Sequence, residues 1–89
     1  MIAFQVFLTP EAQTDILHLD PDLQTRILNK LEWMGQNAEL LRHHALRGEE
    51  WTGCFRYRVG DYRIIYQMDC SAGKLIILKI GHRRQVYGP

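Results

Sequence analysis

Long hydrophobic runs, cysteine clusters and glycine-rich nucleotide motifs are all missing from this 89-residue sequence. No apolar stretch approaches the roughly 18 residues needed to cross a bilayer. The N-terminus has neither a basic leader nor a long apolar segment, so we expect a cytoplasmic protein without a membrane partner. Cys54 and Cys70 form no CxxC pattern and are too few for a disulfide framework, which indicates reduced thiols. Without a P-loop, GxGxxG or GxSxG motif, nucleotide-binding enzymes and serine hydrolases have no support.

A strong excess of one charge is absent as well, since 11 basic residues face 10 acidic ones. Their distribution is uneven. Residues 1–46 contain three lysines and arginines against six acidic residues, whereas residues 47–89 contain eight against four. A basic half on a nearly neutral chain indicates a surface that binds a polyanion. The length and the 46% of hydrophobic residues predict one folded domain over residues 1–89.

Two helices are predicted after a short strand at the start of the chain. Alternating apolar residues predict the strand over residues 2–8. Thr9-Pro10-Glu11 then supplies a capping hydroxyl, a first-turn proline and an acidic side chain for a helix. Asp20-Pro21-Asp22 repeats this start for a second helix, in which apolar residues recur on one face. The two helices form a hairpin, and its apolar faces are expected to pack against a sheet.

The last third of the sequence predicts three strands. They span residues 53–59, 62–68 and 74–80, and the third is a nearly continuous apolar run suited to a central strand. A connection over residues 35–52 precedes them, with a helical turn expected at Glu39–Leu46. We therefore expect an α+β fold, in which a small, mainly antiparallel sheet of about four strands is covered on one face by the N-terminal helical hairpin.

The turn Gly60-Asp61 sets the pairing of the first two of these strands, because glycine stands first in a two-residue loop. In this register Arg58 lies opposite Arg63, and alternation places both on one face with Arg56. Like charges directly opposite each other destabilise a sheet unless an anion or an acidic side chain neutralises them. The three arginines are therefore either the solvated outer face of a half-covered sheet or a site for a phosphodiester, whose oxygens match the planar guanidinium.

Basic and aromatic residues also follow the last strand. Histidine is the side chain suited to acid–base chemistry near neutral pH, so His82 is a candidate acid or base, with an ordinary surface histidine as the alternative. Tyr87 is a candidate for proton transfer or base stacking, or else packs against the sheet edge. Lys79 and Arg84 are candidate RNA-binding residues. Because strand ends bring side chains from several elements together, we expect the residues after the strand to join the arginine face.

The other histidines and the tryptophans carry less weight. His43 and His44 are adjacent, so neither helix nor strand spacing directs both at one metal ion, and no Cys/His set supports them. We expect neither a metal nor a cofactor. Trp33 is expected in the core, whereas Trp51 lies in a polar loop and either packs or stacks on a base or a partner.

Three motifs lie in the segments LRGEEWTGCFRYRVGDYRIIYQMD and KLIILKIGHRRQVY. They are a Leu-x-Gly before the hairpin, an Arg-x-Gly-x-Tyr-Arg turn, and a strand that ends in Gly-His-Arg-x-x-x-Tyr. Over residues 46–87 this pattern resembles the RelE/ParE superfamily of toxins from type II toxin–antitoxin modules, and the N-terminal elements fit the family in order and length. The resemblance implies a toxin held inactive by a cognate RelB-like antitoxin, with operator DNA bound only through that complex.

The superfamily contains two functional types. RelE-type members cleave messenger RNA in the ribosomal A site and inhibit translation, and ParE-type members poison DNA gyrase. Retention of Arg83 and Tyr87 together favours the RelE type. The expected activity is a ribosome-dependent, metal-independent endoribonuclease that leaves a 2′,3′-cyclic phosphate. The alternatives are a gyrase inhibitor without nuclease activity, and an inactive member that binds the antitoxin and regulates its operator.

The resemblance also implies the catalytic residues. RelE-type catalysis uses basic residues on the hairpin, an arginine after the turn, an arginine past the last strand and a terminal tyrosine. These match Arg56, Arg58, Arg63, Arg83 and Tyr87. Well-known members carry lysines where this chain has arginines on the hairpin, and arginine stays protonated in proteins. The arginines are therefore expected to stabilise charge on the phosphate, while Tyr87 or His82 transfers protons, with the roles of acid and base left open.

Overall fold

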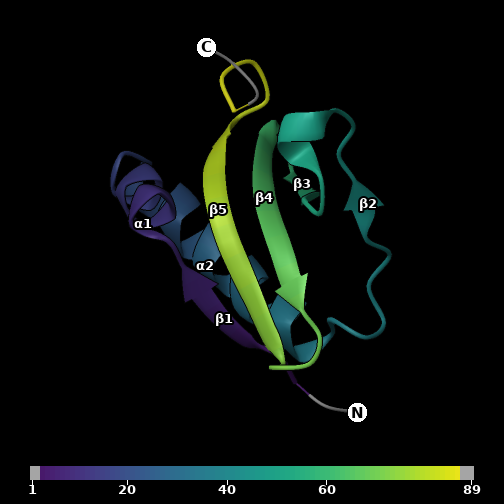
Figure 1. Cartoon of the computed structure of the whole chain (residues 1–89). Helices are drawn as coiled ribbons and strands as arrows, with labels where there is room; N and C mark the ends of the chain where they lie inside the picture. Colours follow the sequence, from purple (N-terminus) through teal and green to yellow (C-terminus); the bar gives the residue numbers. More distant parts are fainter. Residues whose placement is uncertain (1–2, 87–89) are drawn as a thin grey trace.

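Two helices and five strands follow one another in the order β1, α1, α2, β2, β3, β4, β5, with a short 3₁₀ helix η1 before β3 (Figure 1). The computed structural model describes residues 3–86. The bounds are β1 Gln5–Leu8, α1 Pro10–Leu17, α2 Pro21–Gln36, β2 His44–Ala45, η1 Glu49–Trp51, β3 Phe55–Val59, β4 Tyr62–Asp69 and β5 Lys74–His82. The α+β class and the helical hairpin predicted from the sequence are confirmed. Neither helix of the described residues is long and apolar enough to cross a bilayer.

The sheet has the strand order β1-β5-β4-β3-β2. The predicted meander of β3, β4 and β5 is confirmed, and β1 pairs with β5 in the parallel direction. The two-residue strand β2 was not predicted, and it lies within Glu39–Leu46, where the helical turn was expected. That expectation was wrong. The reason is a tertiary contact, because His44 and Ala45 pair with the open edge of β3.

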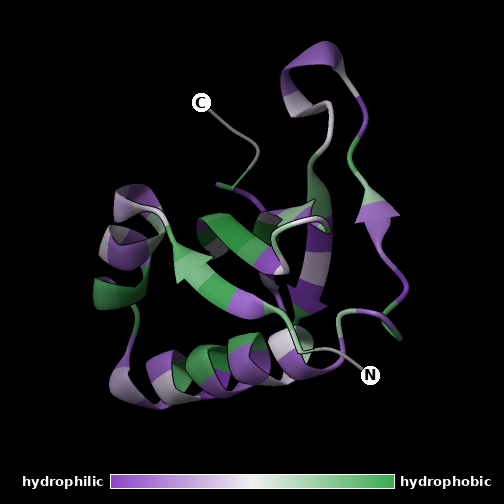
Figure 2. Ribbon diagram, turned by 60° about the horizontal axis from the view of Figure 1, so that its bottom comes forward, coloured by the Kyte–Doolittle hydropathy of each residue, from purple (hydrophilic) through white to green (hydrophobic). Residues whose placement is uncertain are grey.

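Both helices pack on the same face of the sheet, with the apolar side of α2 turned toward the strands (Figure 2). The predicted helix stripes form the main core together with side chains from every strand except β2. Its buried members are Ala12, Ile16, Ile27, Leu31, Met34, Val59, Ile64, Tyr66, Leu75, Ile77 and Ile80. Trp33 is not among them. It remains 41% exposed, and its ring lies 6.3 Å from that of Tyr57, so its assignment to the core was wrong.

The two helix starts differ in how they are capped. The Oγ1 of Thr9 accepts a hydrogen bond from the backbone N–H of Ala12 at 3.2 Å, as the sequence predicted for α1. Asp20 stands at the corresponding position of α2, but its side chain makes no capping hydrogen bond. The start of α2 therefore depends on Pro21, on the acidic Asp22 in the first turn and on packing against the sheet.

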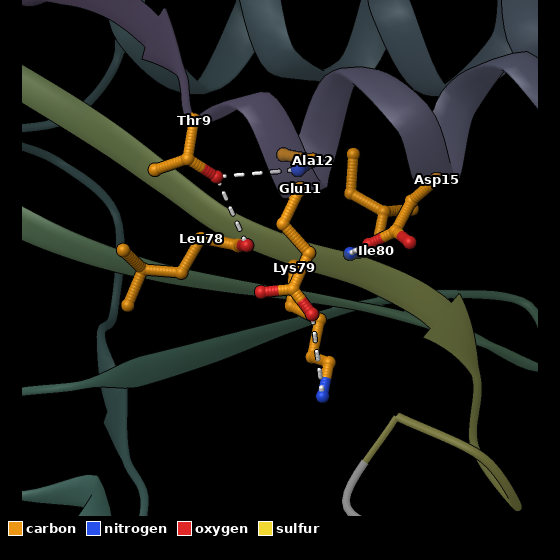
Figure 3. A network of polar contacts seen from close by, with 7 residues as sticks. All are labelled: Thr9, Glu11, Ala12, Asp15, Leu78, Lys79 and Ile80. Atoms are coloured by element: carbon orange, nitrogen blue, oxygen red, sulfur yellow. Dashed lines mark hydrogen bonds and ion pairs between the residues drawn. The ribbon is translucent and has the colours of Figure 1, made fainter.

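Helix α1 also covers the part of the β5 edge that β1 leaves open, because β1 ends at Leu8 opposite Ile77. Figure 3 shows the contacts. Thr9 Oγ1 donates to the carbonyl of Leu78 at 3.1 Å, and Asp15 Oδ2 accepts from the N–H of Ile80 at 2.9 Å. Side chains of α1 thus satisfy edge groups of β5 that would otherwise be unpaired. They hold the end of β5 in place, where several candidate site residues lie.

Gly35 is needed where α2 crosses the chain leading into β1. The backbone N–H of Phe4 donates to the Gly35 carbonyl at 2.8 Å. A Cβ at Gly35 would lie 2.7 Å from the Phe4 carbonyl oxygen and 2.8 Å from Val6 Cγ2. We expect Gly35→Ala to destabilise the protein by about 1–3 kcal/mol through overpacking, although alanine gains about 1 kcal/mol in helix propensity. Urea unfolding measures the change, with the exposed Gln36→Ala as control. A more stable Gly35→Ala protein would contradict this close approach.

Candidate functional site

The β3–β4 hairpin has the register that the sequence predicted. Val59 pairs with Tyr62 and Arg58 with Arg63, around the turn Gly60-Asp61. Gly60 has a φ of +59°, a left-handed conformation that glycine adopts without strain. Arg56, Arg58 and Arg63 therefore lie on the face of the sheet that points away from the helices, as expected. We call it the outer face.

The helical hairpin covers only the other face, as expected, but the outer face is not simply solvated. A second apolar cluster lies on it, formed by the connection before β3, by the strands and by the tail after β5. Its members are the buried Cys54, Ile65 and Val86, with Leu46, Trp51 and Leu78 packed against them. Val86 lies 3.5 Å from where a side chain on Gly81 would begin, so the tail folds back over the end of β5. Gly81 is the cross-strand partner of Arg63.

Arg63, on the same face, is also buried, with only 7% of its surface exposed. Its Nη1 donates to the carbonyls of Gly60 and Tyr62, both at 3.1 Å, which ties the guanidinium to the hairpin turn. Within residues 3–86, Arg63 has no carboxylate within 4.0 Å. Buried charges in proteins are normally paired, because an unpaired one loses its hydration without compensation. An arginine held in this way suits the binding of an external anion.

Arg83 lies at the same turn. Its backbone N–H donates to the Asp61 carbonyl at 2.8 Å, and its Nε lies 4.0 Å from Asp61 Oδ1. Both side chains are more than half exposed, and an exposed ion pair of this kind contributes about 0–1 kcal/mol. An incoming phosphate therefore has only a weak competitor for the Arg83 guanidinium. Arg63 and Arg83 thus both contact residues of the turn.

His82 does not join the arginines, and that expectation was wrong. It pairs with Tyr62, whereas Arg63 pairs with Gly81, so alternation directs His82 toward the helix-covered face. Its ring packs edge-on against Tyr62 at 5.6 Å. Its Nδ1 accepts a hydrogen bond from the backbone N–H of Arg84 at 3.2 Å, which places the proton of the neutral ring on Nε2.

The remaining predicted residues are spread over the same end of the sheet. Lys79 pairs with Ile65 and so belongs to the outer face, where its Nζ lies 3.7 Å from Glu11 Oε1 (Figure 3). Arg84 is exposed in the turn after β5. Tyr87 lies outside the described residues.

The sequence did not single out two basic residues that lie beside the hairpin. A groove of about 510 Å³ is lined by Leu41, Arg42, His44, Arg56, Tyr57 and Arg58. We call it the β3 groove. Arg42 was hidden because the N-terminal half is acidic overall, and His44 was considered only as a metal ligand. Arg42 and His44 are two residues apart, like Arg56 and Arg58, but two residues are too few to indicate a strand from the sequence.

His43 has a structural role instead. Its Nε2 donates to the Ala38 carbonyl at 2.8 Å, so its Nδ1 is free to accept a hydrogen bond from the Tyr66 hydroxyl at 2.6 Å. Burial raises the pKa of Tyr66 to about 12, so this tyrosine stays neutral and is unsuited to act as a base. The pair anchors the connection to the core. Among residues 3–86, no three histidine, cysteine or acidic side chains are grouped to hold a metal ion.

Solved structures define the class of this fold as that of RelE toxins. The toxin–antitoxin complex RelBE2 from Mycobacterium tuberculosis matches with a TM-score of 0.83 and 26% identity, covering 93% of this chain and 94% of that one. The archaeal RelE–RelB complex from Pyrococcus horikoshii matches with a TM-score of 0.75 and 22% identity, over 96% and 100% of the two chains. The isolated Escherichia coli RelE toxin matches with a TM-score of 0.73 and 17% identity, over 90% and 84%.

Sequence comparison gives the family. Toxin RelG of Mycobacterium tuberculosis is 27% identical over 84 residues, which are 94% of this chain and 95% of that protein. The family model for the ParE toxin of the type II toxin–antitoxin system parDE matches residues 6–87. The chain therefore belongs to the ParE toxin family, within the RelE/ParE superfamily of type II toxins. The resemblance inferred from residues 46–87 is confirmed.

Proposed function

We propose that this toxin is an endoribonuclease that cleaves messenger RNA in the ribosomal A site. The observation that carries the proposal is that Arg63 is buried and its guanidinium donates to backbone carbonyls. Within residues 3–86 no carboxylate lies within 4.0 Å of it. Arg83 lies at the same turn, and Arg58 lies directly opposite Arg63. Planar, permanently charged donors gathered in this way match the oxygens of a phosphodiester.

The chemistry that suits this site is attack by a ribose 2′-hydroxyl on the neighbouring phosphate. The bond to the 5′-oxygen of the next nucleotide breaks, which leaves a 2′,3′-cyclic phosphate and a 5′-hydroxyl. Arg63 and Arg83 stabilise the negative charge that develops on the phosphate, and Arg56 and Arg58 hold the backbone. Since arginine does not release its proton, another group must transfer protons.

Tyr87 is the residue we assign to proton transfer. His82 is directed toward the helix-covered face, and its Nδ1 already accepts a hydrogen bond from the backbone of Arg84. Neither feature suits an acid or base that has to reach a phosphate on the outer face. A phenol can release its proton, and positive charges in general stabilise a phenolate.

The regulatory partner in this proposal is a RelB-like antitoxin that covers the basic outer face. RelB-type proteins are bound to the toxin in the solved complexes from Mycobacterium tuberculosis and Pyrococcus horikoshii. Arg58 and Arg63 lie opposite each other without an acidic partner among residues 3–86, so acidic side chains of the antitoxin can pair with them. Operator DNA is then reached only through the antitoxin. Co-purification from the native operon tests this partnership, and a toxin that is harmless when expressed alone argues against it.

Induction of the toxin in cells supplied with labelled precursors tests the activity. We expect methionine incorporation to stop before DNA synthesis, and primer extension on an abundant transcript to show cuts confined to the translated region. Cuts spread equally over untranslated segments would remove the ribosome from the proposal. Early loss of DNA synthesis with filamentation would instead identify gyrase as the target, as the match to the ParE model allows.

A further inference from the structure

The β3 groove has walls from two segments that are distant in the sequence. The connection contributes Leu41, Arg42 and His44, and the strand β3 contributes Arg56, Tyr57 and Arg58. Pairing of His44 with Arg56 holds the connection beside the strand. The neighbouring His43 is bonded to Tyr66, which is fully buried. These contacts hold both walls of the groove in place in the free protein.

The charges around this groove are of one sign. Arg42 and Arg58 are exposed and Arg56 is half-buried, and within residues 3–86 none of the three has a carboxylate within 4.0 Å. Permanent positive charges crowded around one groove repel one another unless a polyanion is bound there. Arginine also forms two parallel hydrogen bonds to a phosphate.

An aromatic surface continues the groove toward the helices. Tyr57 is one of its lining residues, and the Trp33 ring lies 6.3 Å from the Tyr57 ring. Lys30 Nζ lies 4.7 Å from the centre of the Trp33 ring. Basic side chains interleaved with aromatic rings are what single-stranded nucleic acids bind, through their phosphates and their bases.

We infer that the β3 groove binds the single-stranded message beside the cleaved bond, with Arg42 and His44 as positioning residues. This inference rests on the proposed function. Arg58 lines the groove and lies opposite Arg63, so an RNA strand bound at Arg63 continues over the groove without leaving the protein surface. Arg42 and His44 contact a flanking phosphate and not the reacting one. They contribute to binding of the message and leave the rate of the chemical step unchanged.

The kinetic test separates binding from chemistry. On programmed ribosomes we expect Arg42→Ala to lower kcat/KM about tenfold, the effect of losing one charge-assisted contact, with the single-turnover rate at saturating toxin unchanged. His44→Ala is expected to act in the same direction. The control is Lys74→Ala, which removes one positive charge at the far end of β5, where Lys74 lies over the Phe7 ring. If Arg42→Ala and Lys74→Ala lower kcat/KM equally, the effect comes from net charge alone and the inference is overturned.

A second measurement does not depend on cleavage. The purified toxin is titrated into a fluorescent, fully 2′-O-methylated RNA oligonucleotide, which lacks the attacking hydroxyl, over a range of salt concentrations. We expect Arg42→Ala to reduce the slope of log K against log salt by about 0.7, the value for one phosphate contact on a single strand, and Lys74→Ala to leave it unchanged. A parental toxin that does not bind the oligonucleotide, or an unchanged slope for Arg42→Ala, overturns the inference.

The two measurements distinguish the groove from the activity. One outcome is a parental toxin that does not cleave on ribosomes while Arg42→Ala still reduces the slope of log K against log salt. In that case the proposed function fails and the groove stands as an RNA site. If the parental toxin cleaves and Arg42→Ala matches it in kcat/KM and in slope, the groove inference fails and the proposed function is untouched. Unchanged unfolding temperatures of the variants exclude misfolding as the cause.

Discussion

Replacing Arg63 by alanine is expected to slow single-turnover cleavage on programmed ribosomes by about 10²–10³, which corresponds to about 2.7–4 kcal/mol of transition-state stabilisation. The reason is that Arg63 is buried and its guanidinium is fixed to the carbonyls of Gly60 and Tyr62. Within residues 3–86 no carboxylate neutralises it. A preorganised charge of this kind needs no rearrangement when negative charge develops on the phosphate. Arg63→Lys keeps the charge but loses the planar fork, so we expect only partial rescue.

The Arg63 experiment needs a control for structure, because the same side chain holds the hairpin turn. Arg63→Met removes the charge but fills most of the buried volume, so it leaves a smaller cavity than Arg63→Ala. We expect Arg63→Met to be as inactive as Arg63→Ala, at least as stable as that variant, and still able to bind the antitoxin. If Arg63→Met cleaves at the parental rate, Arg63 is a packing residue and the site assignment is wrong.

Tyr87→Phe is the second substitution with a large expected effect. It removes the hydroxyl and keeps the ring, so loss of a general acid or base should lower the single-turnover rate by about 10²–10⁴ while stacking is preserved. His82→Gln is expected to be much milder, because His82 is directed toward the helix-covered face and packs against Tyr62.

The two variants are compared at saturating toxin, after their unfolding temperatures and antitoxin binding are shown to match the parent. A His82→Gln protein that is slower than Tyr87→Phe would reverse the assignment of proton transfer. Parental rates for both would leave the arginines as the sole chemical contribution of this protein.

Local sequence rules were enough for the hairpin and the helices. Gly60-Asp61 fits only a two-residue turn between the flanking strand patterns, and that turn sets which residues of β3 and β4 face each other. The opposition of Arg58 and Arg63 followed from counting alone. The helix stripes of α1 and α2 were also predictable, because a spacing of three and four residues places side chains on one face wherever the helix packs.

The candidate site was predicted as a set of residue types and only partly as an arrangement. The charge count and the motifs pointed to Arg56, Arg58, Arg63 and Arg83. Neither the charge count nor the motifs identified Arg42. Its position beside β3 depends on the two-residue strand β2, which pairs with β3. A pairing that short carries no periodic signal, because period-2 alternation needs about four residues to be recognised.

The sequence by itself determined the fold class, the family and the face on which the hairpin arginines lie, because each depends on neighbours a few residues apart or on a contiguous motif. The tertiary structure alone decided that Arg63 is buried, on an outer face where the tail and the connection form a second apolar cluster. It also decided that His82 is directed to the other face, which depends on how β5 pairs with β4. Burial and pairing between distant segments result from the whole chain minimising exposed apolar surface and unpaired backbone groups, and no local pattern encodes them.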